Sequence, residues 1–319
     1  MKRLFLIFFL LTSVANAQTT TNISQYGITW TFADSESYGQ FANGDYWVIH
    51  PVTINSITPT QTSTRNGTEV NPTASGDQGF DERANNFDSG LQISLPWSSS
   101  GSAIQSVVSS DSAAEGSSSP YLDNVSVLTV LLSSPPDDGD YLFRPGYCGT
   151  DKTYYYTTDL QTGELQTIET TETGETFATL EGRFERPQIE IGEGATNRRL
   201  RAANNMYNNY APANAGQLNE AIAKLSGDWT VSEKNDLLIY VVQAGIDRYN
   251  AALSGQTWPA GGGHQPGHKI NIVFAGYMLD DADILDEGLE TYFWENRLIQ
   301  NALWGAETTE TDYWDNVTR

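Results

Sequence analysis

Cysteine is almost missing from this chain, because Cys148 is the only one among 319 residues. No disulfide can therefore form within the chain, even in an oxidising compartment. A fold without disulfides must be stabilised by a substantial apolar core. Eight tryptophans and about 300 residues after the N-terminal segment supply enough apolar material for one or two domains.

Basic residues are also scarce. The chain has 17 Lys and Arg against 40 Asp and Glu, which gives a formal net charge of −23. Nucleic acids and anionic membrane surfaces require a basic footprint on the protein, so neither is an expected partner. A strongly acidic surface instead fits a protein that is kept soluble in salt-rich surroundings.

Long apolar runs are absent except at the N-terminus, where Leu4–Leu11 is unbroken. Lys2 and Arg3 precede this run, and Ala15–Ala17 follows it with a small-x-small cleavage pattern. The run is about half the ~20 residues that a membrane span needs. We therefore expect a secretory signal peptide that is cleaved before Gln18, a secreted or periplasmic protein, and no membrane insertion. Cleavage removes two basic residues and no acidic one, so the net charge falls to −25.

The first part of the mature chain, residues 18–160, has the pattern of β-structure. Ile28–Phe32 alternates apolar and polar residues with a period of two, and Ser126–Leu132 is a nearly continuous apolar run. Short strands of this kind pack naturally as an antiparallel sandwich. The expected fold class is therefore α+β, with a β-sandwich-like domain first.

The second part, residues 181–319, has a helical period, and a Thr/Glu-rich linker over 161–180 precedes it. Ser232 is the expected N-cap of the longest helix. The predicted helices cover 214–226, 231–253, 269–279 and 287–304.

Only three histidines exist, at positions 50, 264 and 268. His264 and His268 have a spacing that zinc sites use on a helix, but Pro266 and neighbouring glycines exclude a regular helix there. We therefore expect no metal and no cofactor. His264 could act as a general base at the edge of a cleft, or it could be an ordinary surface histidine in a loop, and its spacing does not separate the two.

The segment 197–210 is unusually rich in Arg, Asn and Tyr. Arg201 and Asn205 could bind and neutralise a carboxylate, and Tyr207 or Tyr210 could donate or accept a proton. Alternatively, the segment is a hydrated helix and loop whose arginines pair with surplus acids. The acidic run Asp280–Asp283 lacks the pattern of a calcium-binding loop and is interpreted as a solvated turn.

Several blocks resemble parts of uncharacterised secreted bacterial proteins. They are Gly39–Trp47, Asn71–Pro72 with Gln78–Asp81, Phe143–Pro145 with Gly149–Lys152, Gln243–Tyr249, and Trp258–His264 with Lys269 and Phe274–Gly276. The order of a β-rich part and an aromatic-rich helical part is similar to extracellular polysaccharide lyases that carry a helical toroid domain. In the similar proteins His264 matches the first histidine of its loop, whereas position 268 is more often arginine.

This resemblance implies a secreted carbohydrate-active protein whose helical part is a partial α/α-toroid and whose partner is a polysaccharide. A uronate lyase would work by β-elimination, with Arg201 and Asn205 neutralising the carboxylate and His264 taking the proton. Tyr207 or Tyr210 would protonate the leaving oxygen. Trp258, Lys269 and Asp247 are the further substrate-binding candidates.

Two features depart from this pattern. Helical toroids contain many more than four helices, and a charge of −25 repels a polyuronate unless arginines or cations focus a positive groove. Two alternatives therefore stay open. One is a glycoside hydrolase with two carboxylates, including Asp247. The other is a non-catalytic carbohydrate-binding or cell-surface protein that uses Trp30, Trp47 and Trp97 as stacking platforms.

Overall fold

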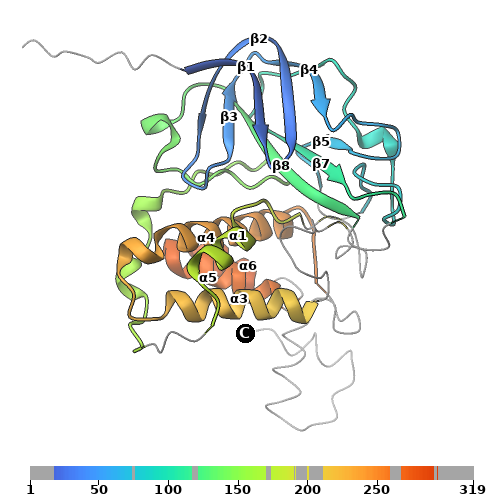
Figure 1. Cartoon of the computed structure of the whole chain (residues 1–319). Coiled ribbons are helices and arrows are strands. Elements are labelled where there is room, and N and C mark those ends of the chain that lie inside the picture. Colours follow the sequence, from blue (N-terminus) through green and yellow to red (C-terminus); the bar gives the residue numbers. More distant parts are fainter. Residues whose placement is uncertain are drawn as a thin grey trace, which may run out of the picture.

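The structure is a computed structural model, and it describes residues 18–73, 76–116, 121–169, 174–189, 191, 200, 211–258, 267–290 and 293. The fold is mixed α+β, and Figure 1 shows a curled sheet on one side and a group of helices on the other. The strands are β1 (Gln18–Gln25), β2 (Ile28–Gln40), β3 (Tyr46–Ile49), β4 (Thr53–Thr58), β5 (Thr68–Val70), β6 (Trp97–Ser98), β7 (Gln105–Ser112) and β8 (Leu122–Leu131). The α-helices are α1 (Phe177–Phe184), α3 (Ala211–Leu225), α4 (Val231–Leu253), α5 (His268–Leu279) and α6 (Ala282–Glu290). Four short 3-10 helices are η1 (Ser89–Leu91), η2 (Pro136–Gly139), η3 (Thr157–Asp159) and η4 (Thr162–Glu164).

All eight described strands belong to one sheet. Its order is β5-β7-β8-β3-β2-β4-β6, and β1 pairs with β2 outside this path. The pairs are antiparallel except for β3 and β8, which run parallel. The described strands therefore form a single mixed sheet rather than a purely antiparallel one.

The inside of the curled sheet holds an apolar core. Ile28, Trp30 and Phe32 alternate with less buried residues along β2, so the period of two in the sequence does mark the buried face. The indole Nε1 of Trp30 donates a hydrogen bond to Ser109 Oγ in β7 at 2.9 Å. Because β2 and β7 are not neighbours in the sheet, this bond crosses the interior of the curl.

Helix α4 is the centre of the other half, and its bounds match the predicted 231–253. Its N-cap is Thr230 rather than Ser232, because Thr230 and Glu233 form a reciprocal capping box. The other helices differ more. α3 begins at 211, α6 covers 282–290 in place of the start of the predicted 287–304, and α1 begins within the predicted linker.

Helix α4 is buried on two faces. One face packs into the helical core through residues such as Leu238, Val241 and Val242. The opposite face, which carries Gln243 and Asp247, is also almost fully buried. A separate apolar cluster joins Val127 of β8 to Ala251 of α4, so the sheet and the helices share a core. Within the described residues, the helices lack a segment that is both long and apolar enough to cross a membrane.

Candidate functional site

An ion triad lies at the contact between the sheet and α4. Arg144 Nε lies 2.6 Å from Asp45 Oδ2, and Arg144 Nη2 lies 2.6 Å from Asp247 Oδ2. All three side chains are at most 1% exposed. The triad therefore joins a turn of the sheet, the segment after η2 and helix α4 through charge-assisted hydrogen bonds.

Further polar groups complete this buried network. Asp45 also accepts hydrogen bonds from Gln25 Nε2 at 3.0 Å and Asn43 Nδ2 at 2.8 Å, and Gln243 Nε2 donates to the carbonyl of Arg144 at 3.0 Å. Burial opposes the charged form of Arg144, but Asp247 and Asp45 outweigh burial and raise the pKa of Arg144. Asp247, a candidate for contact with substrate, thus lies in a closed structural network that no solvent reaches in this structure.

Beside the triad, the surface has a small hollow of about 10 Å³, room for about one water molecule, here named the seam pocket. It is lined by Gly146, Asp151, Thr153 and Tyr155 from the segment after Arg144, and by Ile246, Tyr249, Asn250 and Leu253 from α4. The four α4 residues recur at intervals of three and four, so they share one helical face.

The loop wall of the seam pocket is held close to α4. A Cβ at Gly146 would overlap the side chain of Asn250, so glycine is needed for this approach. Lys152 Nζ donates to the carbonyl of Gly146 at 2.7 Å, to the carbonyl of Cys148 at 3.3 Å and to Ser106 Oγ at 3.1 Å. Burial lowers the pKa of Lys152 to about 7, against the attraction of nearby acids.

Asn250 and two tyrosines supply polar groups in the pocket. Asn250 Nδ2 donates to the carbonyl of Asp151 at 3.2 Å, whereas the buried Oδ1 of Asn250 has no hydrogen-bond partner among the residues described. Tyr155 and Tyr249 are partly exposed and also contact the helical core. Burial, helped by the charges of Asp281 and Asp283, raises the pKa of Tyr249 to about 12. Both phenols therefore stay protonated near neutral pH and can donate hydrogen bonds.

Two other predicted site residues lie in an aromatic stack. The Trp258 ring stacks on His268 at 5.2 Å between centroids and on Phe293 at 5.1 Å. Lys269 Nζ lies over the Phe293 ring, 5.9 Å from its centroid. Because Trp258, His268 and Phe293 are fully buried, this stack packs the helical core and offers no free ring face to a sugar in this structure.

The remaining predicted catalytic and binding residues lie outside the part of the chain that the structure describes. They are His264, Arg201, Asn205, Tyr207 and Tyr210. Whether these five side chains converge therefore stays a prediction. Of the three tryptophans considered as stacking platforms, Trp30 and Trp47 are buried, and Trp97 in the short edge strand β6 is partly exposed.

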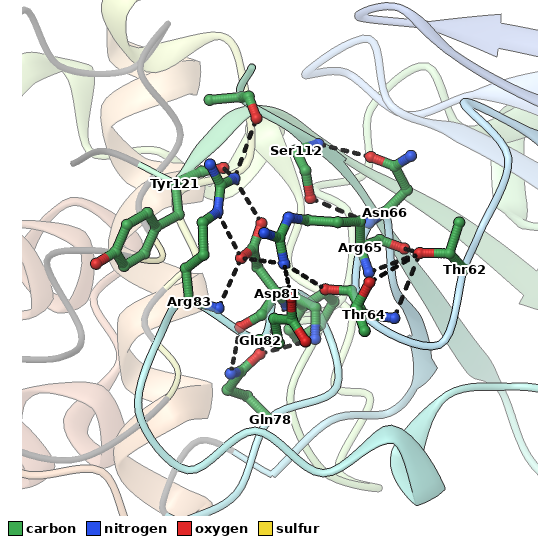
Figure 2. Close-up of polar contacts among 12 residues, drawn as sticks. Thr62, Thr64, Arg65, Asn66, Gln78, Asp81, Glu82, Arg83, Ser112 and Tyr121 are labelled. Carbon is green, nitrogen blue, oxygen red and sulfur yellow. Dashed lines mark hydrogen bonds and ion pairs between the residues drawn. The ribbon is translucent and has the colours of Figure 1, made fainter. Parts of the chain in front are cut away.

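A second polar cluster surrounds Asp81, which is fully buried (Figure 2). Arg83 Nη2 lies 2.7 Å from Asp81 Oδ2, and Arg65 Nη1 lies 3.5 Å from Asp81 Oδ1. Arg83 also donates to the carbonyls of Ala113 and Tyr121 and lies over the Tyr121 ring, 5.0 Å from its centroid. This cluster holds two loops against the end of β7. Because the carboxylate of Asp81 is buried and cannot reach a ligand, the cluster has a structural role.

Sequence reasoning missed the seam pocket because its two walls are far apart in the chain. The signal that could have indicated it is the spacing of Ile246, Tyr249, Asn250 and Leu253 on one helix, together with the close glycines of the segment Phe143–Lys152. In the described ranges, no three His, Cys, Asp or Glu side chains are grouped so that they could hold a metal ion.

Comparisons with known proteins found no match. No family model matches the chain, and neither a curated protein nor a solved structure does.

Proposed function

We propose that this chain is a secreted carbohydrate-active protein that binds a sugar on the surface around the seam pocket. The observation that carries the proposal is the presence of two partly exposed tyrosines, Tyr155 and Tyr249, beside one hollow. Binding sites form preferentially where two parts of a fold meet, and this pocket lies between the segment after Arg144 and α4.

The chemistry of the pocket suits a sugar. A sugar ring has apolar C–H faces and a rim of hydroxyls, so it is bound by aromatic faces together with groups that donate and accept hydrogen bonds. Tyr155 and Tyr249 offer both a ring and a phenolic donor. The exposed Asp151 offers acceptors, which a sugar hydroxyl can satisfy.

Catalysis is a narrower form of this proposal. In the uronate lyase hypothesis, His264 removes the proton beside a carboxylate that Arg201 and Asn205 neutralise, and Tyr207 or Tyr210 protonates the leaving oxygen. The sandwich-like and partial toroid descriptions of the two parts belong to the same proposal.

Binding is tested first, with titration calorimetry against neutral, acidic and amino-sugar oligomers. Tyr249→Ala should lower the affinity for any bound oligomer about tenfold or more, which corresponds to about 1.4 kcal/mol. Thr153→Trp should also weaken binding, because it fills the pocket from an exposed loop position and leaves the core intact. Tyr277→Ala, at an exposed tyrosine of α5, is the matched control. Unchanged affinity in both pocket variants would refute this site.

The lyase hypothesis needs a separate assay. Wild-type protein is screened on alginate, glucuronan, ulvan and pectin for unsaturated products by their ultraviolet absorbance. If His264 is the base, His264→Ala should lower turnover by about 10²–10⁴, with little change in melting temperature. Full activity of His264→Ala on a polymer that the wild type cleaves would remove His264 from the mechanism.

A further inference from the structure

Three stretches of this acidic chain carry no charged side chain. Asp, Glu, Lys and Arg make up 18% of the residues, yet none of them occurs in residues 18–33, 46–64 or 89–110. These stretches contain β1, the first half of β2, β4 and β6, and each of these strands pairs with the next. The fold therefore gathers the uncharged stretches in one part of the sheet. Figure 1 shows β1, β2 and β4 on the side of the molecule away from the helices.

The outer side of β1, β2 and β4 carries hydroxyl and amide groups. Residues that alternate with them along the strands, such as Trp30 and Ile57, are buried in the core. The register of the three strands aligns six outer residues in two rows. One row consists of Ser24, Thr29 and Thr58, and the other of Asn22, Thr31 and Ser56. We name these six residues the hydroxyl face.

The hydroxyl face is open to solvent. Its four residues in β1 and β4 are exposed, and its two central threonines in β2 are half-buried between them. Ser24 Oγ lies 2.7 Å from Thr29 Oγ1, so a hydrogen bond between the two strands orients both hydroxyls. Because a hydroxyl donates one hydrogen bond and can accept two, both groups keep the capacity to bond a ligand.

The lack of charge on this face is a disadvantage for a free surface. Charged side chains on outer strands keep a protein soluble and prevent the pairing of sheet edges. Among the described strands, β1 pairs with β2 alone, and its eight residues include neither a charge nor a proline. A partner that requires a neutral surface accounts for this composition.

The chemistry of the hydroxyl face selects a neutral partner that is rich in hydroxyl groups. An apolar partner would leave the buried hydroxyls of the face without hydrogen bonds, which is costly. A polyanion is repelled by the strongly negative chain, and a polycation is attracted to the acidic remainder of the surface instead. The hydroxyls of a neutral polysaccharide both donate and accept, as the groups of the face do.

We propose that the hydroxyl face binds a neutral polysaccharide across β1, β2 and β4. Neighbouring strands lie about 4.8 Å apart, and alternate residues of one strand lie about 6.6 Å apart. One polymer chain can therefore contact several of the six groups at once, and the weak contacts reinforce each other. The face shares no residue with the seam pocket, so this inference goes beyond the proposed function and does not depend on it.

The test measures depletion of the full chain from solution by insoluble cellulose, mannan and curdlan, which are neutral polymers. The wild type should bind at least one of them, and added salt should not weaken the binding, because no ion pair is involved. Thr29→Val/Thr31→Val removes two hydroxyls from the centre of the face and keeps side chains that suit a strand. This variant should melt as the wild type does and bind about tenfold or more weakly.

A second variant covers the face in place of removing its hydroxyls. Ser24→Lys/Ser56→Lys places a long, hydrated side chain beside each central threonine, and it should also weaken binding about tenfold or more. The matched controls are Thr158→Val/Thr167→Val and Thr158→Lys/Thr167→Lys, which make the same changes at exposed positions outside the sheet. Both controls should bind as the wild type does.

The outcomes separate this inference from the proposed function. Loss of polymer binding in both face variants, with unchanged oligomer binding around the seam pocket, supports the inference. Polymer binding that is kept in both face variants but lost in Tyr249→Ala would overturn it and support the sugar site around the seam pocket.

Three other results would also overturn the inference. One is the absence of binding to all three neutral polymers. Another is an equal loss of binding in the controls, which would show a general effect of the substitutions. The third is a wild-type dimer in sedimentation velocity that both face variants dissociate, without any polymer binding. In that case, the hydroxyl face is an interface between two copies of this chain.

Discussion

Glu69 in β5 carries a carboxyl group that is almost closed off from solvent, at 5% exposure. Its Oε1 accepts a hydrogen bond from the backbone N–H of Gly79 at 2.6 Å. Burial raises the pKa of Glu69 from 4.5 to about 7, although the bond from Gly79 opposes the change. Between about pH 4.5 and 7, this side chain therefore keeps a proton that the unfolded chain has lost.

This difference predicts a pH dependence of stability. Since the pKa is raised in the folded state, the contribution of Glu69 is fully present below about pH 4.5 and is lost as the pH rises through about 7. Glu69→Gln should remove this loss, which is at most about 3 kcal/mol. Urea unfolding between about pH 5 and 8 measures the change in the free energy of unfolding. Glu220→Gln, at an exposed glutamate, is the control. Parallel pH profiles for wild type and Glu69→Gln would contradict the prediction.

Arg144 gives a second prediction at the scale of one residue. Arg144→Met leaves Asp45 and Asp247 buried without a counter-charge, so the free energy of unfolding should fall by about 3–5 kcal/mol. Adding Asp45→Asn and Asp247→Asn to Arg144→Met should restore part of the lost free energy of unfolding. Arg183→Met, whose partners are exposed, should cost less than about 1 kcal/mol. Similar losses in Arg144→Met and Arg183→Met, measured by denaturant unfolding, would show that the triad is unimportant.

The role of Asp247 could not be deduced from the sequence. Its helical spacing placed it on a polar face of α4, and a polar face usually points to solvent. Its partner Arg144 comes from a distant segment, and only the folded chain brings the two together. Local periodicity says which residues share a face, but it does not say what that face meets.

At the scale of elements, helix bounds that depend on residues close together in the chain were predicted best. The bounds of α4 were predicted correctly, because its apolar period and its turn residues are local. The N-cap was displaced by two residues, although Thr230 with Glu233 has the spacing of a capping box. The parallel pairing of β3 with β8 had no local signal, since it joins strands that are far apart in the chain.

Close packing of α4 against α5 gives a prediction with a matched control. A Cβ at Gly245 would lie 2.5 Å from Ala275 Cβ, so Gly245→Ala should force the helices apart and cost about 1–3 kcal/mol. At Gly182 in α1, a Cβ would meet no atom within 4 Å, so Gly182→Ala should instead raise stability by about 0.5–1 kcal/mol. Melting temperatures of the two variants should move in opposite directions. A Gly245→Ala protein as stable as wild type would contradict this packing.

At the scale of the whole molecule, the sheet and the helices should unfold together. The buried triad, the cluster joining Val127 to Ala251, and the bond from Tyr26 to the carbonyl of Glu185 all cross between the two parts. Calorimetry should therefore give one transition whose calorimetric and van't Hoff enthalpies agree. Two resolved transitions would mean that the parts are independent domains. In that case, the predicted linker 161–180 would be a true boundary.

The triad has a consequence for how such a protein can evolve. A sheet half received alone by another chain would keep the pair of Asp45 and Arg144, whereas a helical half received alone would carry Asp247 without its cation. Transfer of the helical part to another sheet would therefore produce a chain with a buried, uncompensated charge at its centre. The two parts are expected to be inherited as a pair, and substitutions at positions 45, 144 and 247 are expected to occur together or not at all.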